Sequence, residues 1–315
     1  HIKGWSTGKT AGLLLAATLL VFSGAAVVKL KRGIEGRMPK QLNAMLQQAL
    51  ATNSRREECL KATMPAPECR YGGTKLGVIV MGDSHAAAVV RAVTNTLPSK
   101  DLYTLDWSLI GCATMAGMHT NFPDRNGCPF FVPYALEKQK SLDPSVPVLI
   151  VNRLSLYFYG ETNETGQNLS IYYFGDRPMH YAELGPSLIK DFKPALVHAA
   201  CELAKTRPVY MLRPIPEMPV DVARVGIRSL YWMGRLPDIS ISLDEYHRRE
   251  ALAWQVQDEA AAQCGVKILD PLPYLCWGGR CHGMKDGHVL YYDNNHLDET
   301  GAALLQPLFA QMFKK

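Results

Sequence analysis

A serine in the N-terminal third of the chain has a setting that suits a nucleophile. Ser84 follows an apolar run, residues 76–81, and the pair Gly82-Asp83, and a helix-forming segment starts at His85. This order predicts a buried strand, a sharp turn and a helix. The serine hydroxyl would then lie at the carboxyl end of a strand, where the N–H groups of the helix start can face an oxyanion. The alternative is that Ser84 only caps a helix.

A base and an orienting acid for this serine occur far along the chain, in one polar loop before a C-terminal helix. Asp293 and His296 lie three positions apart there. A serine nucleophile needs a base within hydrogen-bond reach and a group that fixes the tautomer of that base. One Asp-x-x-His turn supplies both, which makes a Ser-His-Asp set with Ser84. The alternative is that Asp293 forms a turn and His296 is an ordinary loop histidine.

These two segments resemble a known hydrolase superfamily. Gly82-Asp83-Ser84-His85 and Asp293-x-x-His296-Leu297 are similar to blocks I and V of the SGNH (GDSL-like) hydrolases. More narrowly, the chain from Cys59 onward resembles the periplasmic SGNH domain that is fused to the acyltransferase-3 membrane domain in bacterial glycan O-acetyltransferases, including O-antigen acetylases. The features that carry this narrower resemblance are Gly111-Cys112, Asn152-Arg153, Pro214-x-Pro216-Glu217 and the pair Cys276 and Cys281.

The resemblance implies a role for each residue of the set. Ser84 would be the nucleophile, His296 its general base, and Asp293 the residue that orients His296. Block II of the superfamily places a glycine N–H in the oxyanion hole, and Gly111 is the candidate in this chain. The alternative is that Gly111 only serves the geometry of a turn.

A third oxyanion donor is left open, because the sequence departs from the superfamily in block III. That block normally reads Gly-x-Asn-Asp, whereas this chain has Val151-Asn152-Arg153-Leu154. The acyltransferase-linked branch has Arg-Trp there, so Arg153 matches and Leu154 does not. Asn152 could donate to the oxyanion. Arg153 could do so instead, or bind an acidic group of an acceptor sugar, or pair with an aspartate.

Strand-like apolar runs alternate with helical segments over most of the chain. This alternation predicts an α/β fold with a central parallel sheet of about five strands and helices on both faces. The resemblance implies the three-layer α/β/α sandwich of the SGNH hydrolases. In such sheets ligands bind beyond the carboxyl ends of the strands, where Ser84, Gly111 and Asn152-Arg153 are all expected.

The N-terminal segment predicts one transmembrane helix. Residues 10–28 carry no charge and are about long enough to cross a bilayer, although a cleaved signal peptide is the alternative. We expect a short flank at 1–9, a transmembrane helix at 10–28, a linker or stalk at 29–72 and an SGNH-like catalytic domain at 73–315. By resemblance, the helix is the last of a larger membrane domain. The basic residues that follow the helix favour a cytoplasmic position for its C-terminal side, which argues against a domain outside the cytoplasm.

The eight cysteines indicate an oxidising compartment, because most of them form closely spaced pairs. The candidate disulfides are Cys59 with Cys69, Cys112 with Cys128, and Cys276 with Cys281. Cys201 and Cys264 either pair or remain buried thiols. No metal site is expected, because Cys276 and Cys281 and the histidines near them lack a Cys-x-x-Cys core. The net charge of +5 forms no stripe that would indicate nucleic acid binding.

The resemblance implies a periplasmic O-acyltransferase of the bacterial inner membrane that acetylates a cell-surface glycan such as lipopolysaccharide O-antigen. The domain would bind no cofactor, since an acyltransferase-3 membrane domain would supply the acyl group from acyl-CoA. A second hypothesis is that water is the acyl acceptor, in which case the protein is an esterase or glycan deacetylase. A third is a non-catalytic, membrane-anchored sugar-binding domain, which requires Ser84 and His296 to lie apart.

Overall fold

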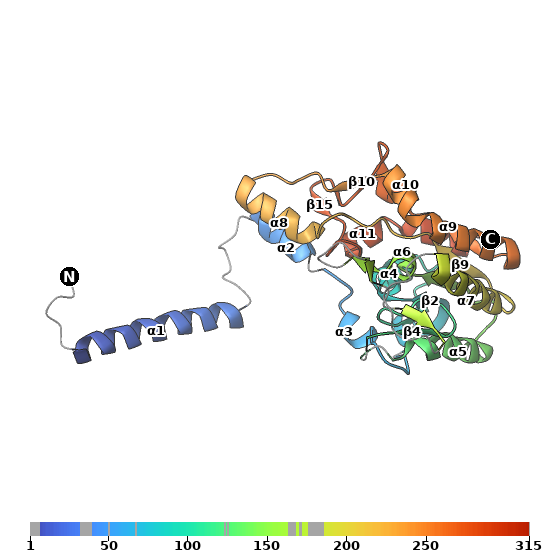
Figure 1. Cartoon of the computed structure of the whole chain (residues 1–315), viewed down its shortest axis with the longest axis horizontal. Helices are drawn as coiled ribbons and strands as arrows, with labels where there is room; N and C mark the ends of the chain where they lie inside the picture. Colours follow the sequence, from blue (N-terminus) through green and yellow to red (C-terminus); the bar gives the residue numbers. More distant parts are fainter. Residues whose placement is uncertain are drawn as a thin grey trace. The chain divides into compact units, whose positions relative to one another are not determined.

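A computed structural model of the chain describes residues 7–31, 40–49, 51–66, 68–122, 124, 126–162, 168–169, 172–175 and 186–314. The chain divides into two compact units, His1–Ala44 and Met45–Lys315 (Figure 1). Most of the first unit that the structure describes is α1 (Thr7–Leu30), a helix of 24 residues without a buried side chain. This helix contains the predicted span 10–28 and is long and apolar enough to cross a membrane.

The second unit is built on a six-stranded sheet with the order β1-β3-β2-β5-β9-β11. Neighbouring strands from β3 to β11 run parallel, and β1 pairs antiparallel with the edge of β3. The predicted parallel strands are therefore confirmed, and β1 is an addition to them. The bounds of the strands are β1 (Cys69–Gly72), β2 (Lys75–Gly82), β3 (Leu102–Ser108), β5 (Val148–Val151), β9 (Val209–Leu212) and β11 (Lys267–Leu269).

Alternate side chains of the strands enter two separate hydrophobic clusters, as the pleat of a strand requires. Val78 and Val80 of β2 belong to one cluster, whereas Ile79 and Met81 belong to the other. All four side chains are fully buried. The central strands are thus covered on both faces, which explains their continuous apolar runs.

Helices cover both faces of the sheet, which confirms the predicted α/β architecture. The first cluster is completed by α4 (Ser84–Thr94), α8 (Val222–Met233), α10 (Leu272–Leu275), α11 (Glu299–Ala303) and α12 (Gln306–Phe309). The second is completed by α5 (Cys128–Lys138), α6 (Leu154–Tyr159) and α7 (Pro186–Ala204). The long helix α9 (Leu243–Cys264) contributes side chains to both clusters.

The remaining elements are short. They are α2 (Lys40–Ala49), α3 (Arg56–Cys59), β4 (Met118–Thr120), η1 (Gln139–Ser141), β6 (Glu161–Thr162), β7 (Asn168–Leu169), β8 (Tyr172–Phe174), β10 (Ser240–Ser242), β12 (Cys276–Trp277), β13 (Arg280–His282), β14 (Met284–Lys285), β15 (His288–Val289) and η2 (Ala310–Phe313).

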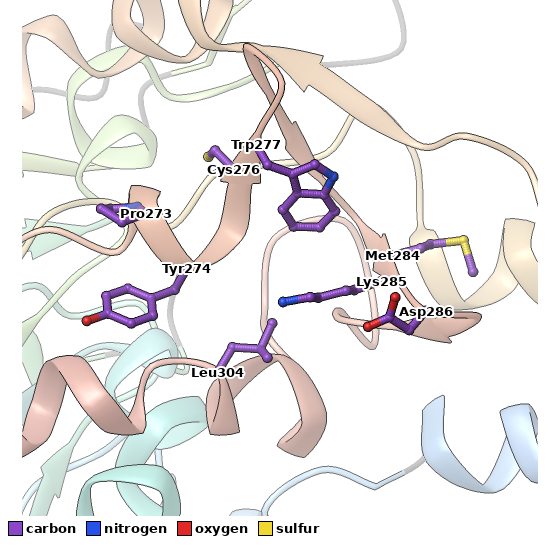
Figure 2. Close-up of a pocket in the computed structure, with 8 residues that line it drawn as sticks. All are labelled: Pro273, Tyr274, Cys276, Trp277, Met284, Lys285, Asp286 and Leu304. Atoms are coloured by element: carbon purple, nitrogen blue, oxygen red, sulfur yellow. The ribbon is translucent and has the colours of Figure 1, made fainter.

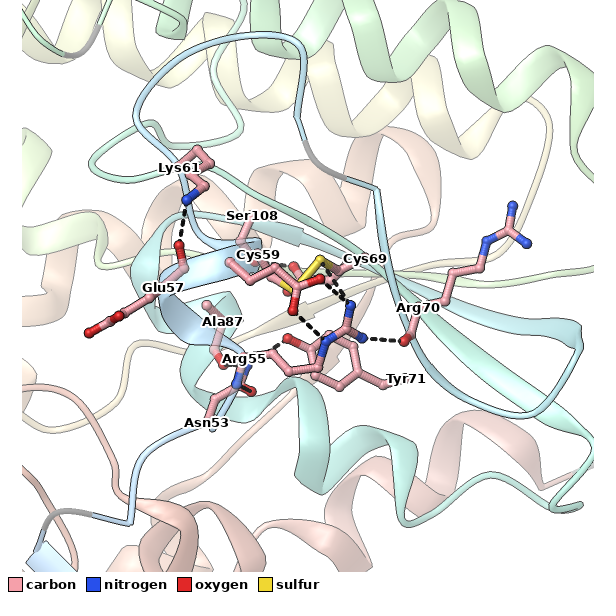
Figure 3. Close-up of a disulfide and its surroundings, with 12 residues drawn as sticks. Asn53, Arg55, Glu57, Cys59, Lys61, Cys69, Arg70, Tyr71, Ala87 and Ser108 are labelled. Carbon is pink, nitrogen blue, oxygen red and sulfur yellow. Dashed lines mark hydrogen bonds and ion pairs between the residues drawn. A yellow bond between two sulfur atoms is a disulfide. The ribbon is translucent and has the colours of Figure 1, made fainter.

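The segment before the sheet is tied to the helix that carries Ser84 (Figure 3). The Asn53 side chain donates to the Tyr71 hydroxyl at 2.9 Å and to the Ala87 carbonyl of α4 at 3.3 Å. The Arg55 guanidinium binds the Glu58 carboxylate and the Arg70 carbonyl. Residues 53–66 and 68–72 therefore pack as part of the domain, with 69–72 in its sheet. The predicted domain boundary at residue 73 stays a prediction; the strand at 69–72 was not predicted, since the segment was expected to be a loop.

All eight cysteines form disulfides. The three expected pairs are present as Cys59–Cys69, Cys112–Cys128 and Cys276–Cys281. The pair that was left open is also bonded, as Cys201–Cys264 between α7 and α9. In the described part of the chain, the one cluster with metal-ligand spacing is Glu58, Cys59 and Cys69. Its sulfurs are bonded to each other and its carboxylate is held by Arg55, so it offers no open ligand set.

Candidate active site

The turn that presents Ser84 depends on a glycine at the end of β2. Gly82 has φ +153°, and a Cβ atom there would lie 1.8 Å from the Val151 carbonyl oxygen of β5. Only glycine allows this approach of the two strands. Asp83 then caps α4, since its side chain accepts a hydrogen bond from the His85 N–H at 2.9 Å. Ser84 is the first residue of the helix, at the end of a central strand.

His296 lies within hydrogen-bond distance of both other members of the Ser-His-Asp set. The Ser84 hydroxyl oxygen is 2.7 Å from His296 Nε2, and His296 Nδ1 is 2.6 Å from Asp293 Oδ2. An ionised carboxylate only accepts, so the Nδ1–H donates to Asp293 and Nε2 accepts from the serine hydroxyl. Asp293 Oδ1 also accepts from the backbone N–H groups of Asn295 and His296, which fixes the turn.

The carboxyl group of Asp293 stays ionised in this turn. Its burial alone would raise its pKa, but the hydrogen bond and the charge of His296 outweigh that effect and lower the pKa to about 2. A carboxylate that remains charged at neutral pH can stabilise an imidazolium at His296. The Tyr292 ring covers one face of that imidazole, with ring centroids 5.2 Å apart and planes inclined by 9°.

A second histidine lies against the same ring. His85 is buried, and its Nε2 is 3.0 Å from Asn295 Oδ1 in the loop that carries His296. Burial, followed by the charge of the nearby His296, lowers the pKa of His85 to about 4. His85 is therefore neutral at physiological pH, and its Nε2–H donates to Asn295. The sequence marked His85 only as part of a motif.

Asp83 joins the nucleophile turn to the end of the neighbouring strand. Its Oδ2 accepts from the Arg153 N–H at 2.7 Å and from the Tyr157 hydroxyl at 2.9 Å. The Asp83 side chain is 1% exposed, so these bonds replace water completely. No sequence signal identified Tyr157 as a partner of Asp83.

Two of the three oxyanion candidates lie on strand ends or loops beside this turn. Asn152 directly follows β5, and its Oδ1 accepts from the Thr114 N–H at 3.2 Å, which fixes the orientation of the carboxamide. Gly111 lies in the loop after β3 with φ +61°. Among the residues that the structure describes, none accepts a hydrogen bond from the Gly111 N–H. The roles of Asn152 and Gly111 as oxyanion donors stay predictions.

The guanidinium of Arg153 binds a buried carboxylate. Arg153 Nε and Nη2 bind Glu217 Oε1 and Oε2 at 3.0 and 2.7 Å, a bidentate pair. Arg249 of α9 binds the same carboxylate at 2.8 Å, and the Ser155 hydroxyl donates to it at 2.6 Å. Of the proposed roles for Arg153, the geometry matches an ion pair, with a glutamate in place of the expected aspartate.

This ion cluster contains two buried carboxyl groups in opposite states. Burial would raise the pKa of Glu217, but the bonds and charges of Arg153 and Arg249 lower it to about 2. Glu250, also buried, lacks such bonds, and its Oε1 is 3.8 Å from Arg249 Nε. Burial, followed by the charge of Glu217, raises the pKa of Glu250 to about 8. Neither glutamate was assigned a role from the sequence, although Glu217 was part of the quoted Pro-x-Pro-Glu motif.

A cavity of about 550 Å³ lies between this cluster and the loop of His296. Its polar walls include Arg153, Glu217, Glu245, Arg249, Asn294 and Asn295. Backbone bonds hold the two sides together, because the Met218 N–H donates to the Asn294 carbonyl at 2.7 Å and the Val222 N–H to the Asp293 carbonyl at 3.0 Å. These polar walls suit a ligand with many hydroxyl groups.

The fold is the α/β sandwich of the SGNH hydrolases. The family model described as "SGNH domain (fused to AT3 domains)" matches residues 55–311, so the chain belongs to this family. Membership supports an enzyme that transfers an acyl group or hydrolyses an ester, without distinguishing between them. The description of the family also supports an acyltransferase-3 (AT3) membrane domain as a partner of this domain in the chain.

Comparison with solved structures finds similarity to acetyltransferases and an acetylesterase. The lipopolysaccharide acetyltransferase periplasmic domain of Salmonella ser. Paratyphi A is 14% identical, with 89% of this chain and 98% of that chain covered and a TM-score of 0.59. A carbohydrate acetylesterase of Sinorhizobium meliloti is 13% identical, with 76% and 98% covered and a TM-score of 0.44. The catalytic domain of a Streptococcus pneumoniae peptidoglycan O-acetyltransferase is 15% identical, with 76% and 92% covered and a TM-score of 0.34. No curated protein matches the sequence.

Proposed function

We propose that this domain is an O-acyltransferase that places an acyl group, acetyl in the first instance, on a hydroxyl of a cell-surface glycan such as lipopolysaccharide O-antigen. The observation that carries the proposal is the continuous hydrogen-bonded series from the Ser84 hydroxyl through His296 to Asp293. This series can activate a serine for acyl transfer. The family's association with AT3 domains favours transfer over hydrolysis.

In the first half of the reaction, the Ser84 oxygen attacks the acyl carbonyl of the donor while His296 Nε2 takes the hydroxyl proton. The Asp293 carboxylate stabilises the imidazolium that forms. Backbone N–H groups of Ser84 and Gly111, with the Asn152 amide, hold the oxyanion of the tetrahedral intermediate. The donor's leaving group departs with the proton from His296, and the acyl group remains as an ester of Ser84.

In the second half, a glycan hydroxyl gives its proton to His296 Nε2 and attacks the acyl-serine carbonyl. The second tetrahedral intermediate collapses, the proton returns to Ser84, and the acylated glycan leaves. The polar cavity beside Asn294 and Asn295 is the proposed acceptor site, since hydroxyl groups can bind its amides and charged groups. Arg153 acts there through Glu217, as a positioning residue.

The proposal places the catalytic domain in the periplasm of a bacterium, anchored at the inner membrane. The helix α1 is long and apolar enough for such an anchor. The AT3 domain would deliver the acyl group from a cytoplasmic acyl-CoA, so the domain itself would need no cofactor. The four disulfides suit this oxidising compartment.

The experiment that tests this function compares the 315-residue chain with its Ser84→Ala variant. Each protein receives p-nitrophenyl acetate as a soluble donor, with and without de-O-acetylated O-antigen oligosaccharide. We expect Ser84-dependent release of p-nitrophenol and an oligosaccharide whose mass rises by one acetyl group. The exposed serine variant Ser145→Ala is the matched control and should retain full activity.

Two results would redirect the assignment. Ser84-dependent release of acetate with no mass gain in the oligosaccharide would favour the esterase or deacetylase reading, in which water is the acceptor. Equal activity of Ser84→Ala and the parent would remove the nucleophile assignment and favour a non-catalytic sugar-binding domain. The contact of 2.7 Å between Ser84 and His296 argues against that last reading, which needs the two residues to lie apart.

A further inference from the structure

A second hollow, of about 680 Å³, opens on the surface formed by two short hairpins (Figure 2). The hairpins are β12–β13 and β14–β15, and Leu304 closes the hollow from the C-terminal region. Other side chains that line the hollow are those of Trp277, Met284, Lys285 and Asp286. None of these residues belongs to the site around Ser84.

Trp277 forms a rigid aromatic wall in this hollow. The Cys276–Cys281 disulfide cross-links the hairpin that carries it, and Gly278 and Gly279 close the turn with positive φ angles. The His282 ring stacks on the indole with centroids 4.0 Å apart and planes inclined by 11°. Even so, Trp277 remains 41% exposed. An indole that is held in place and partly exposed loses little conformational entropy when a flat ligand face covers it.

A positively charged and a negatively charged side chain lie near the Trp277 ring. The Lys285 Nζ atom lies 5.5 Å from the centre of the Trp277 ring, and in Figure 2 its side chain extends between Trp277 and Leu304. Asp286 follows at the tip of the second hairpin. Neither Lys285 nor Asp286 has an ion-pair partner within the described ranges of the chain. One donor and one acceptor of charge-assisted hydrogen bonds therefore face the hollow without net charge.

An apolar ring face combined with a donor and an acceptor matches the chemistry of an uncharged pyranose. The C–H groups of such a sugar can cover the indole, while its hydroxyls bind the ammonium and the carboxylate. An acidic sugar would bring its negative charge close to Asp286. The hollow therefore favours neutral sugars.

The backbone links the hollow closely to the proposed catalytic loop. Asp286 precedes Asp293 by seven residues, which span at most about 25 Å when fully extended. The Leu290 N–H donates to the Gly283 carbonyl at 2.9 Å, and the Asp298 N–H donates to the Leu290 carbonyl at 3.0 Å, so this connection is firmly held.

We propose that the hollow of Trp277, Lys285 and Asp286 is a second glycan site, which binds a neutral pyranose of the acceptor chain away from the sugar that is acylated. This inference rests on the proposed function for its biological ligand. Its physical content, the binding of a neutral pyranose at Trp277, does not depend on acyl transfer. The site would hold a polymeric acceptor on the domain while its repeating units are presented to Ser84.

The test uses the full chain with Ser84→Ala in detergent, so that no acyl chemistry takes place. The indole N–H signals are recorded by NMR, and the Trp277 signal is assigned by its loss in Trp277→Phe. The probes are the methyl pyranosides of glucose, galactose, mannose and rhamnose at tens of millimolar, with methyl glucuronide as the acidic sugar and glycerol as the control for hydroxyl groups. We expect at least one pyranoside, but not glycerol, to shift the Trp277 signal in a saturable way.

Variants then identify the polar contacts. Lys285→Ala and Asp286→Asn should each weaken the apparent affinity about fivefold. Trp232→Ala, which removes an indole that is 73% exposed on α8, is the matched control and should leave the titration unchanged. Near-identical urea midpoints for these variants would exclude misfolding as the cause of a loss.

Three results would overturn the inference. They are a Trp277 signal that no pyranoside moves, a shift that appears only with methyl glucuronide, and a shift that Lys285→Ala and Asp286→Asn both leave unchanged. None of these results bears on the Ser84-dependent release of p-nitrophenol. A failure of the second site and a failure of the proposed function can therefore be told apart.

Discussion

The imidazole rings of His85 and His296 lie with their centroids 4.7 Å apart and their planes inclined by 53°. A proton on His85 would place a positive charge beside the residue that accepts a proton from Ser84 in the proposed mechanism. Burial prevents this by lowering the pKa of His85 to about 4. The neutral ring instead holds Asn295, and through it the loop of the base.

We therefore predict that His85→Leu lowers kcat for p-nitrophenyl acetate by about 10- to 100-fold, because the loop of His296 loses its anchor. The KM should change less than about twofold. His85→Gln keeps a donor for Asn295 and should recover part of kcat. Steady-state kinetics of the three proteins measure this, and an unchanged kcat for His85→Leu would show that the contact with Asn295 has no positioning role.

Replacing the orienting acid should have a larger effect. Asp293→Asn removes the charge that stabilises the His296 imidazolium and favours the wrong tautomer, so we expect kcat to fall by about 10³- to 10⁴-fold. Since the pKa of Asp293 is about 2, its own titration should leave no inflection in the parent's pH–rate profile between pH 5 and 8. Asp238→Asn, a change at an exposed carboxylate outside the site, is the control. A loss below tenfold would contradict the role of Asp293.

The pairing of Glu217 with Arg153 and Arg249 should be essential for stability. Glu217→Gln leaves two guanidinium groups without their carboxylate, and we expect the free energy of unfolding to fall by about 3 kcal/mol. The double variant Glu217→Leu/Arg153→Met removes the buried pair as a unit and should lose less. Urea unfolding at pH 7 compares them. A double variant that is less stable than Glu217→Gln would refute this account.

Because the pKa of Glu250 is raised, we predict that this residue makes the folded protein less stable as the pH rises. Its pKa is about 8 in the folded protein and close to 4.5 in the unfolded chain, so the folded state holds an extra proton between these values. The stability linked to Glu250 is present below about pH 4.5 and is lost as the pH rises through about 8. In Glu250→Gln this loss disappears. The variant should match the parent at pH 5 and exceed it by a few kcal/mol at pH 8, since one pKa unit corresponds to about 1.4 kcal/mol.

Urea unfolding of parent and variant at both pH values measures this difference. Other groups also titrate in the interval, His85 among them, so only the difference between the two proteins reports Glu250. Parallel stability curves from pH 5 to 8 would mean that Glu250 is ionised in the folded protein.

The sequence identified the parts of the site that follow from local patterns. Ser84 at a strand–turn–helix and the Asp-x-x-His spacing of Asp293 and His296 predicted the geometry that the structure contains. The parallel strands followed from their apolar runs. Strand β1 was not predicted. It has four residues and follows two prolines, and this part of the chain was interpreted as a loop.

Contacts between residues far apart in the chain could not be predicted from the sequence. His85 and Asn295 are 210 residues apart, and Arg153 and Glu217 are 64 apart, so no periodicity links them. The partner of Cys201 was open for the same reason, since its disulfide spans 63 residues of chain. Such pairs are decided by which helices and strands lie side by side, which a single sequence does not contain.

The order of the disulfides has a consequence for biosynthesis. In chain order the first cysteine is bonded to the second, the third to the fourth, the fifth to the sixth and the seventh to the eighth, so no bridge encloses or crosses another. A chain that emerges N-terminus first exposes its cysteines in this same order. An oxidase that joins each new thiol to the one still waiting would make all four native bonds. Maturation of this domain would then need an oxidant but no disulfide isomerase.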